Sequence, residues 1–207
     1  MVFYYTSSDG HLLYMGRDKF ENEELIKYGW DEDIWFHVDD LSSAHVYLRL
    51  NEGEEWTNID EKLIQECCQL VKENSIQGKK KDKVDIVYTP WSNLHKTNNM
   101  EVGAIGFHSE NLRKKVRDIT RDKDIVKAII KTEREEEKPD FRDLKEKHIL
   151  ELKRKRFKEF KEQQKKEDEE NKQKLLEKQS KNYNYLNENK EMMTSNKNAP
   201  DDDEDFI

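Results

Sequence analysis

Two segments on either side of the pair Ser42-Ser43 place aromatic and polar side chains at alternate positions. Residues two apart in a strand share one face of a sheet. If segments 34–38 and 45–50 pair as strands, one face is apolar and the other carries two aromatic rings, two imidazoles and a guanidinium, from Trp35, His37, His45, Tyr47 and Arg49. Rings stack on bases, at ~1–3 kcal/mol per base, and cations neutralise phosphates. This face could bind single-stranded nucleic acid; alternatively, a helix covers it and the histidines are hydrogen-bonded internally.

Basic clusters close to aromatic residues form a second candidate region. Lys79-Lys80-Lys81 follow Gly78, and Arg113-Lys114-Lys115 follow the segment 102–107. Between the two clusters lies the loop 90–96, which carries Trp91, His95 and Lys96. Basic clusters are commonly just solvated surface, but cations interleaved with aromatic rings favour a polyanionic partner.

Catalytic and metal-binding patterns are weak by comparison. Asp33 and His37 could act as a base and its orienting partner, yet no serine or cysteine lies in a nucleophile elbow, and no Walker loop, GxGxxG or GxSxG motif occurs. Zinc sites usually show a local ligand pair such as HxxxH. No such pair occurs among the residues that could ligate a metal, which are His37, His45, His95, His108, Asp31, Asp33 and Asp39. We therefore expect no enzyme, no metal site and no cofactor.

The elements that would position these residues occupy about residues 1–120. Short apolar runs between turn signals predict strands at 2–5, 12–15, 34–38, 45–50, 84–88 and, more weakly, 102–107. Asp18 can cap a helix that ends at Gly29, with Phe20, Leu25 and Ile26 facing inward. A second helix, starting at Asp60, repeats apolar residues at helical spacing. Strand runs interrupted by two helices predict an α+β fold, a mixed β-sheet with packed helices.

A long charged α-helix is predicted next, at about 121–180. No strand pattern appears from residue 131 on. Apolar residues between 141 and 160 recur every eight positions, which makes them drift by ~80° per step around a helix, whereas a two-stranded coiled coil needs a repeat near seven. Acid-before-base pairs at i,i+4, such as Glu162/Lys166, support a solvated helix or weak coiled coil. The end, 181–207, is rich in Asn, Lys and Asp and predicts a disordered acidic tail.

The composition agrees with one domain plus a non-globular part. Hydrophobic residues make up 33% and charged residues 41% of the chain, against ~45–50% and ~25% in typical domains. The net charge of −8 is unevenly distributed: residues 1–78 carry −11 and residues 79–130 carry +5. Binding of a polyanion depends on the field within ~8–10 Å, so the global sign excludes little.

Several other classes of protein are disfavoured. No apolar run reaches the ~18 residues of a membrane span, and the first residues, MVFYYTSSDG, lack the pattern of a secretory signal. The two cysteines, Cys67 and Cys68, are adjacent, which rules out a disulfide framework. We expect a reduced, soluble, cytoplasmic protein.

Five sequence motifs in order resemble the NFACT-R domain. They are GRDKFENEEL at 16–25, DIWFHV at 33–38, LSSAHV at 41–46, VYTPWSNLHK at 87–96 and VGAIGF at 102–107. The resemblance covers about residues 1–120. It implies an α+β domain presumed to bind RNA, which in larger relatives accompanies ribosome quality-control factors that engage stalled subunits carrying peptidyl-tRNA. Nothing here matches the separate module with which those relatives extend stalled chains.

The resemblance also implies candidate ligand residues: Asn22, Asp33, Trp35, His37, Ser43, His45 and Lys96. Where relatives place a basic pair, this chain has His95-Lys96.

Taken together, we predict a non-enzymatic nucleic-acid-binding protein, with RNA from a tRNA or the ribosome favoured over DNA. DNA binding through the same cations is one alternative, and a protein-interaction adaptor acting through the charged helix is another. The predicted binding residues are Arg17, Lys19, Trp35, His37, Ser43, His45, Lys79, Lys80, Trp91, His95, Lys96, Arg113, Lys114 and Lys115.

Overall fold

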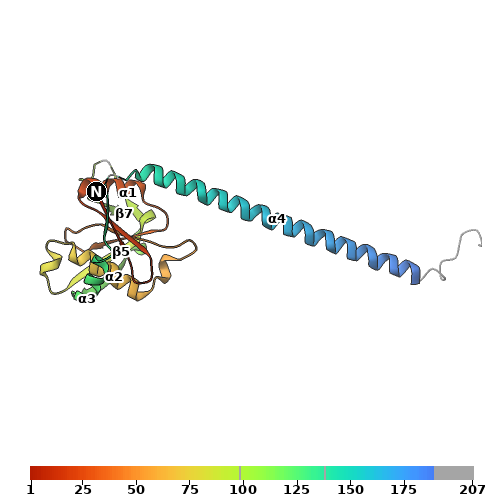
Figure 1. Cartoon of the computed structure of the whole chain (residues 1–207), viewed down its shortest axis with the longest axis horizontal. Helices are drawn as coiled ribbons and strands as arrows, with labels where there is room; N and C mark the ends of the chain where they lie inside the picture. Colours follow the sequence, from red (N-terminus) through yellow and green to blue (C-terminus); the bar gives the residue numbers. More distant parts are fainter. Residues whose placement is uncertain (98, 138, 189–207) are drawn as a thin grey trace, which may run out of the picture. The chain divides into compact units, whose positions relative to one another are not determined.

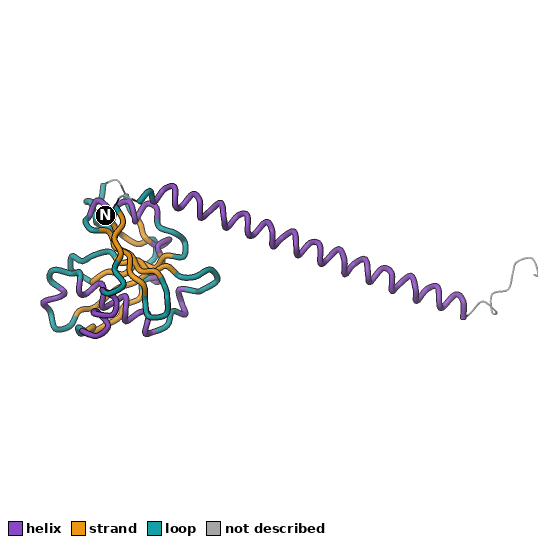
Figure 2. Tube along the Cα trace, in the orientation of Figure 1, coloured by secondary structure: helices purple, strands orange, loops and turns teal. Residues whose placement is uncertain are grey.

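The first part of the chain folds around a seven-stranded sheet (Figures 1 and 2). The structure, a computed structural model, describes residues 1–97, 99–137 and 139–188. The strand order is β8-β5-β3-β4-β2-β1-β9. The strands are β1 (Val2–Thr6), β2 (Leu12–Gly16), β3 (Asp33–Val38), β4 (Val46–Arg49), β5 (Val84–Pro90), β8 (Lys114–Ile119) and β9 (Arg134–Glu136). The α+β class is confirmed, but every described strand pair is antiparallel, so the expected mixed sheet was wrong in that detail.

One face of the sheet is covered by α2 (Glu61–Glu73) and α3 (Lys123–Ile130). Leu63, Cys67 and Val71 of α2 pack against strand residues such as Phe36 and Leu48, both fully buried. Asp60 caps α2 by accepting from the Lys62 N–H at 2.7 Å. These contacts form the main hydrophobic core, and the expected apolar face of α2 lies in it.

The other face is covered as well. There α1 (Lys19–Tyr28), the hairpin of β6 (Leu94–His95) and β7 (Gly106–Phe107), and the start of α4 (Phe141–Glu188) enclose a second core. Trp35 and Tyr47 lie at its centre, 2% and 0% exposed. In Figure 1, α1 and β7 lie on one side of β5 and α2 and α3 on the other. The face that carries Trp35 and Tyr47 is therefore covered, which agrees with the second of the two alternatives that the sequence left open.

Helix α1 starts at the expected residue but presents a different side chain to solvent. Asp18 accepts from the backbone N–H groups of Phe20 and Glu21 at 2.9 and 3.1 Å, as an N-cap does. Leu25 and Ile26 are buried, whereas Phe20 is 65% exposed. The expectation that Phe20 faces inward was wrong.

The domain continues past the boundary expected near residue 120. Helix α3 and strand β9 lie in the segment that was expected to be a charged helix, and β9 pairs with β1. Two compact units result, one of residues 1–148 and a second that begins at Ile149. Helix α4 begins only at Phe141 and includes residues 181–188 of the expected tail; the rest of that tail, 189–207, lies outside the described residues.

Within the second unit, the described part of α4 is solvated. Phe157 and Phe160 are 60% and 57% exposed, and its ion pairs join residues four apart, as in Lys174–Glu170. Across the part of the chain that the structure describes, no helix combines the length and apolar character needed to cross a bilayer. Short 3-10 turns lie at η1 (Trp56–Asn58), η2 (Gly78–Lys80), η3 (Trp91–Asn93) and η4 (Glu110–Leu112).

Candidate nucleic-acid interface

An open cleft of about 640 Å³ gathers several of the predicted residues. It lies between the turn from β2 to α1, the loop from β3 to β4, and the loop 101–104. Five of the predicted binding residues line it, together with Asn22: Arg17, Lys19, His37, Ser43 and His45. We call this cavity the cleft.

Local backbone structure positions the side of the cleft formed by α1. The Asp18 cap fixes the first helical turn, which carries Lys19 and Asn22. Gly16, the last residue of β2, packs against Asn22, and a Cβ atom at Gly16 would come within 2.6 Å of Asn22 Oδ1. A glycine is therefore needed for α1 to approach β2 this closely.

The floor of the cleft contains two imidazoles in contact with an indole, one stacked on it and one edge-on. The His37 ring lies parallel to Trp35 with 5.2 Å between centroids, and the His45 ring meets His37 edge-on at 5.0 Å. Burial lowers the pKa of His45 to about 3, helped by the charges of His37 and Lys96. Burial also lowers the pKa of His37. Both rings are therefore neutral at pH 7 and act as hydrogen-bonding groups, not as cations.

Lys96 does not line the cleft but holds the loop 101–104, which forms one of its walls. Its ammonium group donates to Glu23 Oε1 and to the backbone oxygens of Glu101 and Ala104, each at 2.7 Å. Glu23 Oε1 also accepts from the Gly103 N–H at 2.6 Å. An ammonium has three donors, so these contacts use all of them. The predicted phosphate contact by Lys96 is therefore corrected: the residue fixes the loop 101–104 against α1.

The two tryptophans expected to stack on bases are not free. Trp35 is 2% exposed. Trp91 is half-buried: its Nε1 donates to the Ile26 backbone oxygen at 2.8 Å, and Lys145 Nζ lies 3.9 Å from its ring centroid. Phe20, which the sequence interpretation assigned to the core, is instead the exposed aromatic ring beside Lys19.

The basic turn at Lys79 and Lys80 adjoins the cleft. Asn74 and Ile76 of the same turn line the cleft, and Ser75 Oγ donates to the Ser42 backbone oxygen at 2.9 Å. Lys79 forms an ion pair with Glu73 at 2.5 Å, and Lys80 is exposed.

A buried lysine holds this basic turn in place. Lys72 is 1% exposed, and its ammonium donates to the backbone oxygens of Gly78, Lys81 and Asp82 at 2.8–3.3 Å. We did not predict this role of Lys72. The only indication of it in the sequence is that Lys72 is an isolated lysine on the apolar face of α2.

Three further predicted cations lie on β8 or just before it. Strand alternation points Lys114 and Lys115 to opposite faces, so they do not form one patch. Lys115 pairs with Asp39 at the start of the β3–β4 loop, whereas Lys114 lies 4.6 Å from the Trp56 ring centroid on the main-core face. Arg113 pairs with Glu110 at 3.1 Å.

His95 and Ser43 have local partners. His95 lines a neighbouring cavity of about 770 Å³ between α1 and the hairpin, where its ring meets His108 at 4.7 Å. The Ser43 hydroxyl accepts from the Val38 N–H and donates to the Ala44 backbone oxygen, both at 3.1 Å. Ser43 thus shapes the β3–β4 loop.

Asp33 is not available as a catalytic base. It is fully buried, and its carboxylate accepts from Arg49 Nε at 2.8 Å and from the Tyr14 hydroxyl at 2.5 Å. Within the described residues, no three His, Cys, Asp or Glu side chains come together as a metal site would require.

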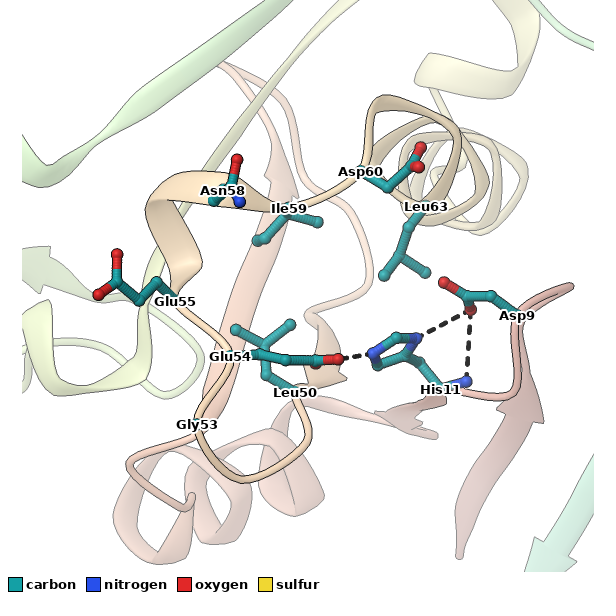
Figure 3. A pocket seen from close by; sticks show the side chains of 10 residues that line it. All are labelled: Asp9, His11, Leu50, Gly53, Glu54, Glu55, Asn58, Ile59, Asp60 and Leu63. Atoms are coloured by element: carbon teal, nitrogen blue, oxygen red, sulfur yellow. Dashed lines mark hydrogen bonds and ion pairs between the residues drawn. The ribbon is translucent and has the colours of Figure 1, made fainter.

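A third cavity, of about 500 Å³, is acidic (Figure 3). Asp9, Glu54 and Asp60 lie around it, and His11 lies between the carboxylates of Asp9 and Glu54 at 2.9 and 2.8 Å. This cavity adjoins Leu63 near the start of α2, and the cleft adjoins Asn74 after its end, so roughly 16 Å of helix separate them. That exceeds the ~8–10 Å screening length, which keeps the acidic surface from dominating the cleft.

His11 makes stability depend on pH. Burial lowers the pKa of His11, but the hydrogen bonds and charges of Asp9 and Glu54 outweigh burial, so the pKa is raised. This contribution to stability is fully present below the unfolded-state pKa of 6.5 and is lost as pH rises through the raised pKa. We expect His11→Gln to lower the free energy of unfolding more at about pH 5.5 than at about pH 8.5, as measured by urea unfolding.

Glu54→Gln provides the control for that prediction. It removes one of the two carboxylates that face His11 and should shrink the pH-dependent difference. An equal effect of His11→Gln at both pH values would contradict the assignment.

The sequence places this domain in a known family. Residues 1–109 match the family described as NFACT protein RNA binding domain, and the chain belongs to that family. The expected resemblance is thereby confirmed.

Three relatives differ in their identity to this chain. The chain is 57% identical over 138 residues to "Coiled-coil domain-containing protein 25 homolog" of Dictyostelium discoideum, covering 66% of this chain and 67% of that one. It is 40% identical over 140 residues to "Protein JLP2" of Saccharomyces cerevisiae, covering 64% and 67%. The match to "Rqc2 homolog RqcH" of Bacillus subtilis is 26% over 108 residues, 52% of this chain and 18% of that protein.

A solved structure shares the fold. The C-terminal part of the fibronectin/fibrinogen-binding protein from Streptococcus suis superposes with a TM-score of 0.52 at 21% identity, over 61% of this chain and 47% of that one. The family match and the similarity to the protein named Rqc2 homolog RqcH support an RNA-related function.

Proposed function

We propose that the chain is a non-enzymatic, cytoplasmic RNA-binding protein that contacts RNA through the cleft. One observation carries the proposal: family-motif residues from separate elements, Asn22, His37, Ser43 and His45, line the same cavity in a domain of an RNA-binding family. No catalytic step is needed to account for this arrangement.

The charges around the cleft suit a polyanion. Arg17 and Lys19 lie on its rim and are exposed, and no ion pair to either is found among the described residues. Lys80 is exposed on the adjoining turn. Cations without a carboxylate partner can exchange their counterions for phosphates at the lowest cost.

We propose tRNA or ribosomal RNA as the partner. The similarity to the protein named Rqc2 homolog RqcH supports this, together with the quality-control context that the NFACT-R resemblance implies. DNA would use the same cations, so the matched DNA is included in the test below.

The test is the salt dependence of RNA affinity. Arg17→Glu with Lys19→Glu is expected to weaken binding to unfractionated tRNA and to reduce the log–log salt slope by ~0.7–0.9 for each phosphate that the variant no longer neutralises. Fluorescence anisotropy across a salt series measures both quantities, and DNA of the same sequence and length as a synthetic RNA probe tests the preference for RNA.

The matched control reverses charge elsewhere in the same domain. Lys127 and Lys131 are exposed on α3 and just after it, on the face of the sheet opposite α1. Lys127→Glu with Lys131→Glu should leave the slope unchanged. If both double variants changed the slope equally, the effect would be one of total charge, and the cleft would not be the site.

A further inference from the structure

Two buried side chains on the floor of the cleft each carry a polar atom that has no hydrogen-bond partner among the described residues. His45 is 4% exposed and Asn22 is 7% exposed, and both line the cleft. Nδ1 of His45 and Oδ1 of Asn22 are unpartnered, as are Trp35 Nε1 and the Tyr47 hydroxyl in the adjacent core. Native proteins nearly always pair buried polar atoms. Two unpaired polar atoms in one floor, with two more in the core beside it, point to a ligand that hydrogen-bonds at the floor.

The chemistry of this floor is neutral and of mixed polarity. A neutral imidazole offers one donor and one acceptor, and a carboxamide offers donors together with an acceptor. Phosphate groups only accept and are best matched by cations. The edge of a nucleobase presents both donors and acceptors, so His45 and Asn22 complement a base and not a phosphate.

The rim of the cleft supplies the remaining parts of a nucleotide site. Arg17 and Lys19 provide exposed cations there, and Ile76 and Val102 provide apolar surface that is 83% and 45% exposed. The volume of about 640 Å³ lies within the ~300–1,000 Å³ range of small-ligand sites. Phe20, 65% exposed beside Lys19, adds an aromatic ring next to the rim.

We propose that the cleft takes one unpaired nucleotide of an RNA strand, with its base at His45 and Asn22 and its phosphate at Arg17 and Lys19. This inference rests on the proposed function and specifies its ligand. In a duplex the base edges are paired, and the deep groove of A-form RNA excludes side chains. The cleft therefore distinguishes RNA with an unpaired end or loop from fully paired RNA.

The experiment compares two RNA probes and two variants of the full chain. The probes are a fluorescent two-stranded RNA duplex with an unpaired 3′ tail and the same duplex with blunt ends, so that only the first contains unpaired nucleotides. His45→Phe keeps the ring contacts with Trp35 and His37 but removes both nitrogens. His95→Phe makes the same change in the neighbouring cavity and serves as the control.

We expect the unmodified chain to bind the tailed duplex at least about tenfold more tightly than the blunt one, since one base contact supplies that factor. His45→Phe should abolish the preference while leaving the affinity for the blunt duplex unchanged, and His95→Phe should retain the preference. A thermal melt verifies that His45→Phe is folded, as expected when an unpaired buried polar group becomes apolar.

Two results would overturn the inference without touching the proposed function. One is equal binding of both duplexes by the unmodified chain. The other is a preference that survives in His45→Phe, which would mean that ordered water, and not a base, hydrogen-bonds to the unpaired atoms of the floor. Failure to bind either duplex would overturn the proposed function itself.

Discussion

Replacing Asp33 with alanine is expected to destabilise the domain by ~3–5 kcal/mol, the cost of removing one partner from a buried ion pair. Asp33 is fully buried, while its partner Arg49 keeps 22% of its side chain exposed. Removing the carboxylate leaves the guanidinium without its counter-charge and the Tyr14 hydroxyl without its acceptor.

The surroundings of Arg49 limit how far water can replace the lost carboxylate. Its guanidinium carbon lies 3.5 Å from the Trp30 ring centroid and 5.1 Å from that of Tyr14, so the group is held between two aromatic rings. Burial, followed by the negative charge of Asp33, raises the pKa of Tyr14 well above its usual value, so the phenol stays protonated and donates to Asp33. Water can reach little of this network to replace the carboxylate.

Urea unfolding measures the effect, with an exposed ion pair as the control. Glu146→Ala breaks the pair with Arg142 on α4, where both side chains are more than 60% exposed, and should change the midpoint far less. Asp33→Asn keeps the shape and one acceptor oxygen and should fall between the two. An Asp33→Ala midpoint equal to that of Glu146→Ala would show that the network contributes nothing to stability.

The strands and helix caps could be predicted because their signals are local. Alternation placed β1 and β2 within a residue of their observed ends, and Asp18 and Asp60 cap the predicted helices. The prediction that Phe20 faces inward was wrong, and the sequence itself contained the information to avoid this error. At ~100° per residue, Phe20 lies ~140° around the helix from Leu25 and ~120° from Ile26, so it could not share their face.

Five of the predicted binding residues line the cleft, but the sequence did not predict the surface that they form. Alternation correctly placed Trp35 and His37 on one face of β3, but whether that face is open depends on what covers it. The covering residues include Leu94 and Phe141, which lie 59 and 106 positions after Trp35 in the chain. Likewise, the sequence shows Lys96 only as a cation. Its bonds to the carbonyl groups of the loop 101–104 become visible only in the folded structure.

Strand β9 was missed for a different reason. Its residues, Arg134-Glu135-Glu136, are all charged and exposed, with none of the β-branched or aromatic residues typical of strands. Charged side chains are how an edge strand avoids pairing with other molecules. The position of β9 is therefore determined by its backbone pairing with the neighbouring β1, and not by its own composition.

Ending the chain at Ile130 is expected to cost the domain at least ~3 kcal/mol, because the loss of a partly buried aromatic side chain adds to the loss of a paired strand. The truncation removes Phe141, which packs on the second core, and strand β9, which pairs with β1. It also removes Glu133, which accepts from the Tyr5 hydroxyl at 2.7 Å. β1 then becomes an uncharged edge that can pair with other chains.

A chain ending at Glu151 should behave differently. It keeps β9, Phe141 and the stacking of His148 on Trp30, with 3.7 Å between centroids. We expect its urea midpoint and RNA affinity to match those of the full chain, while the chain ending at Ile130 unfolds earlier and elutes as aggregates in gel filtration. Equal stability of the two truncated chains would show that residues 131–151 do not complete the domain.

Because the two truncated chains are expected to differ in stability, only the chain ending at Glu151 can test whether the charged helix acts as an adaptor. A partner lost on truncation at Ile130 could be lost because the domain has come apart, whereas a partner lost on truncation at Glu151 must have bound residues 152–207. That segment carries a run of basic residues, Lys153 to Arg156, and the exposed rings of Phe157 and Phe160. If the chain ending at Glu151 also keeps its full RNA affinity and salt slope, the cleft alone accounts for RNA binding, and the helix is left for a protein partner.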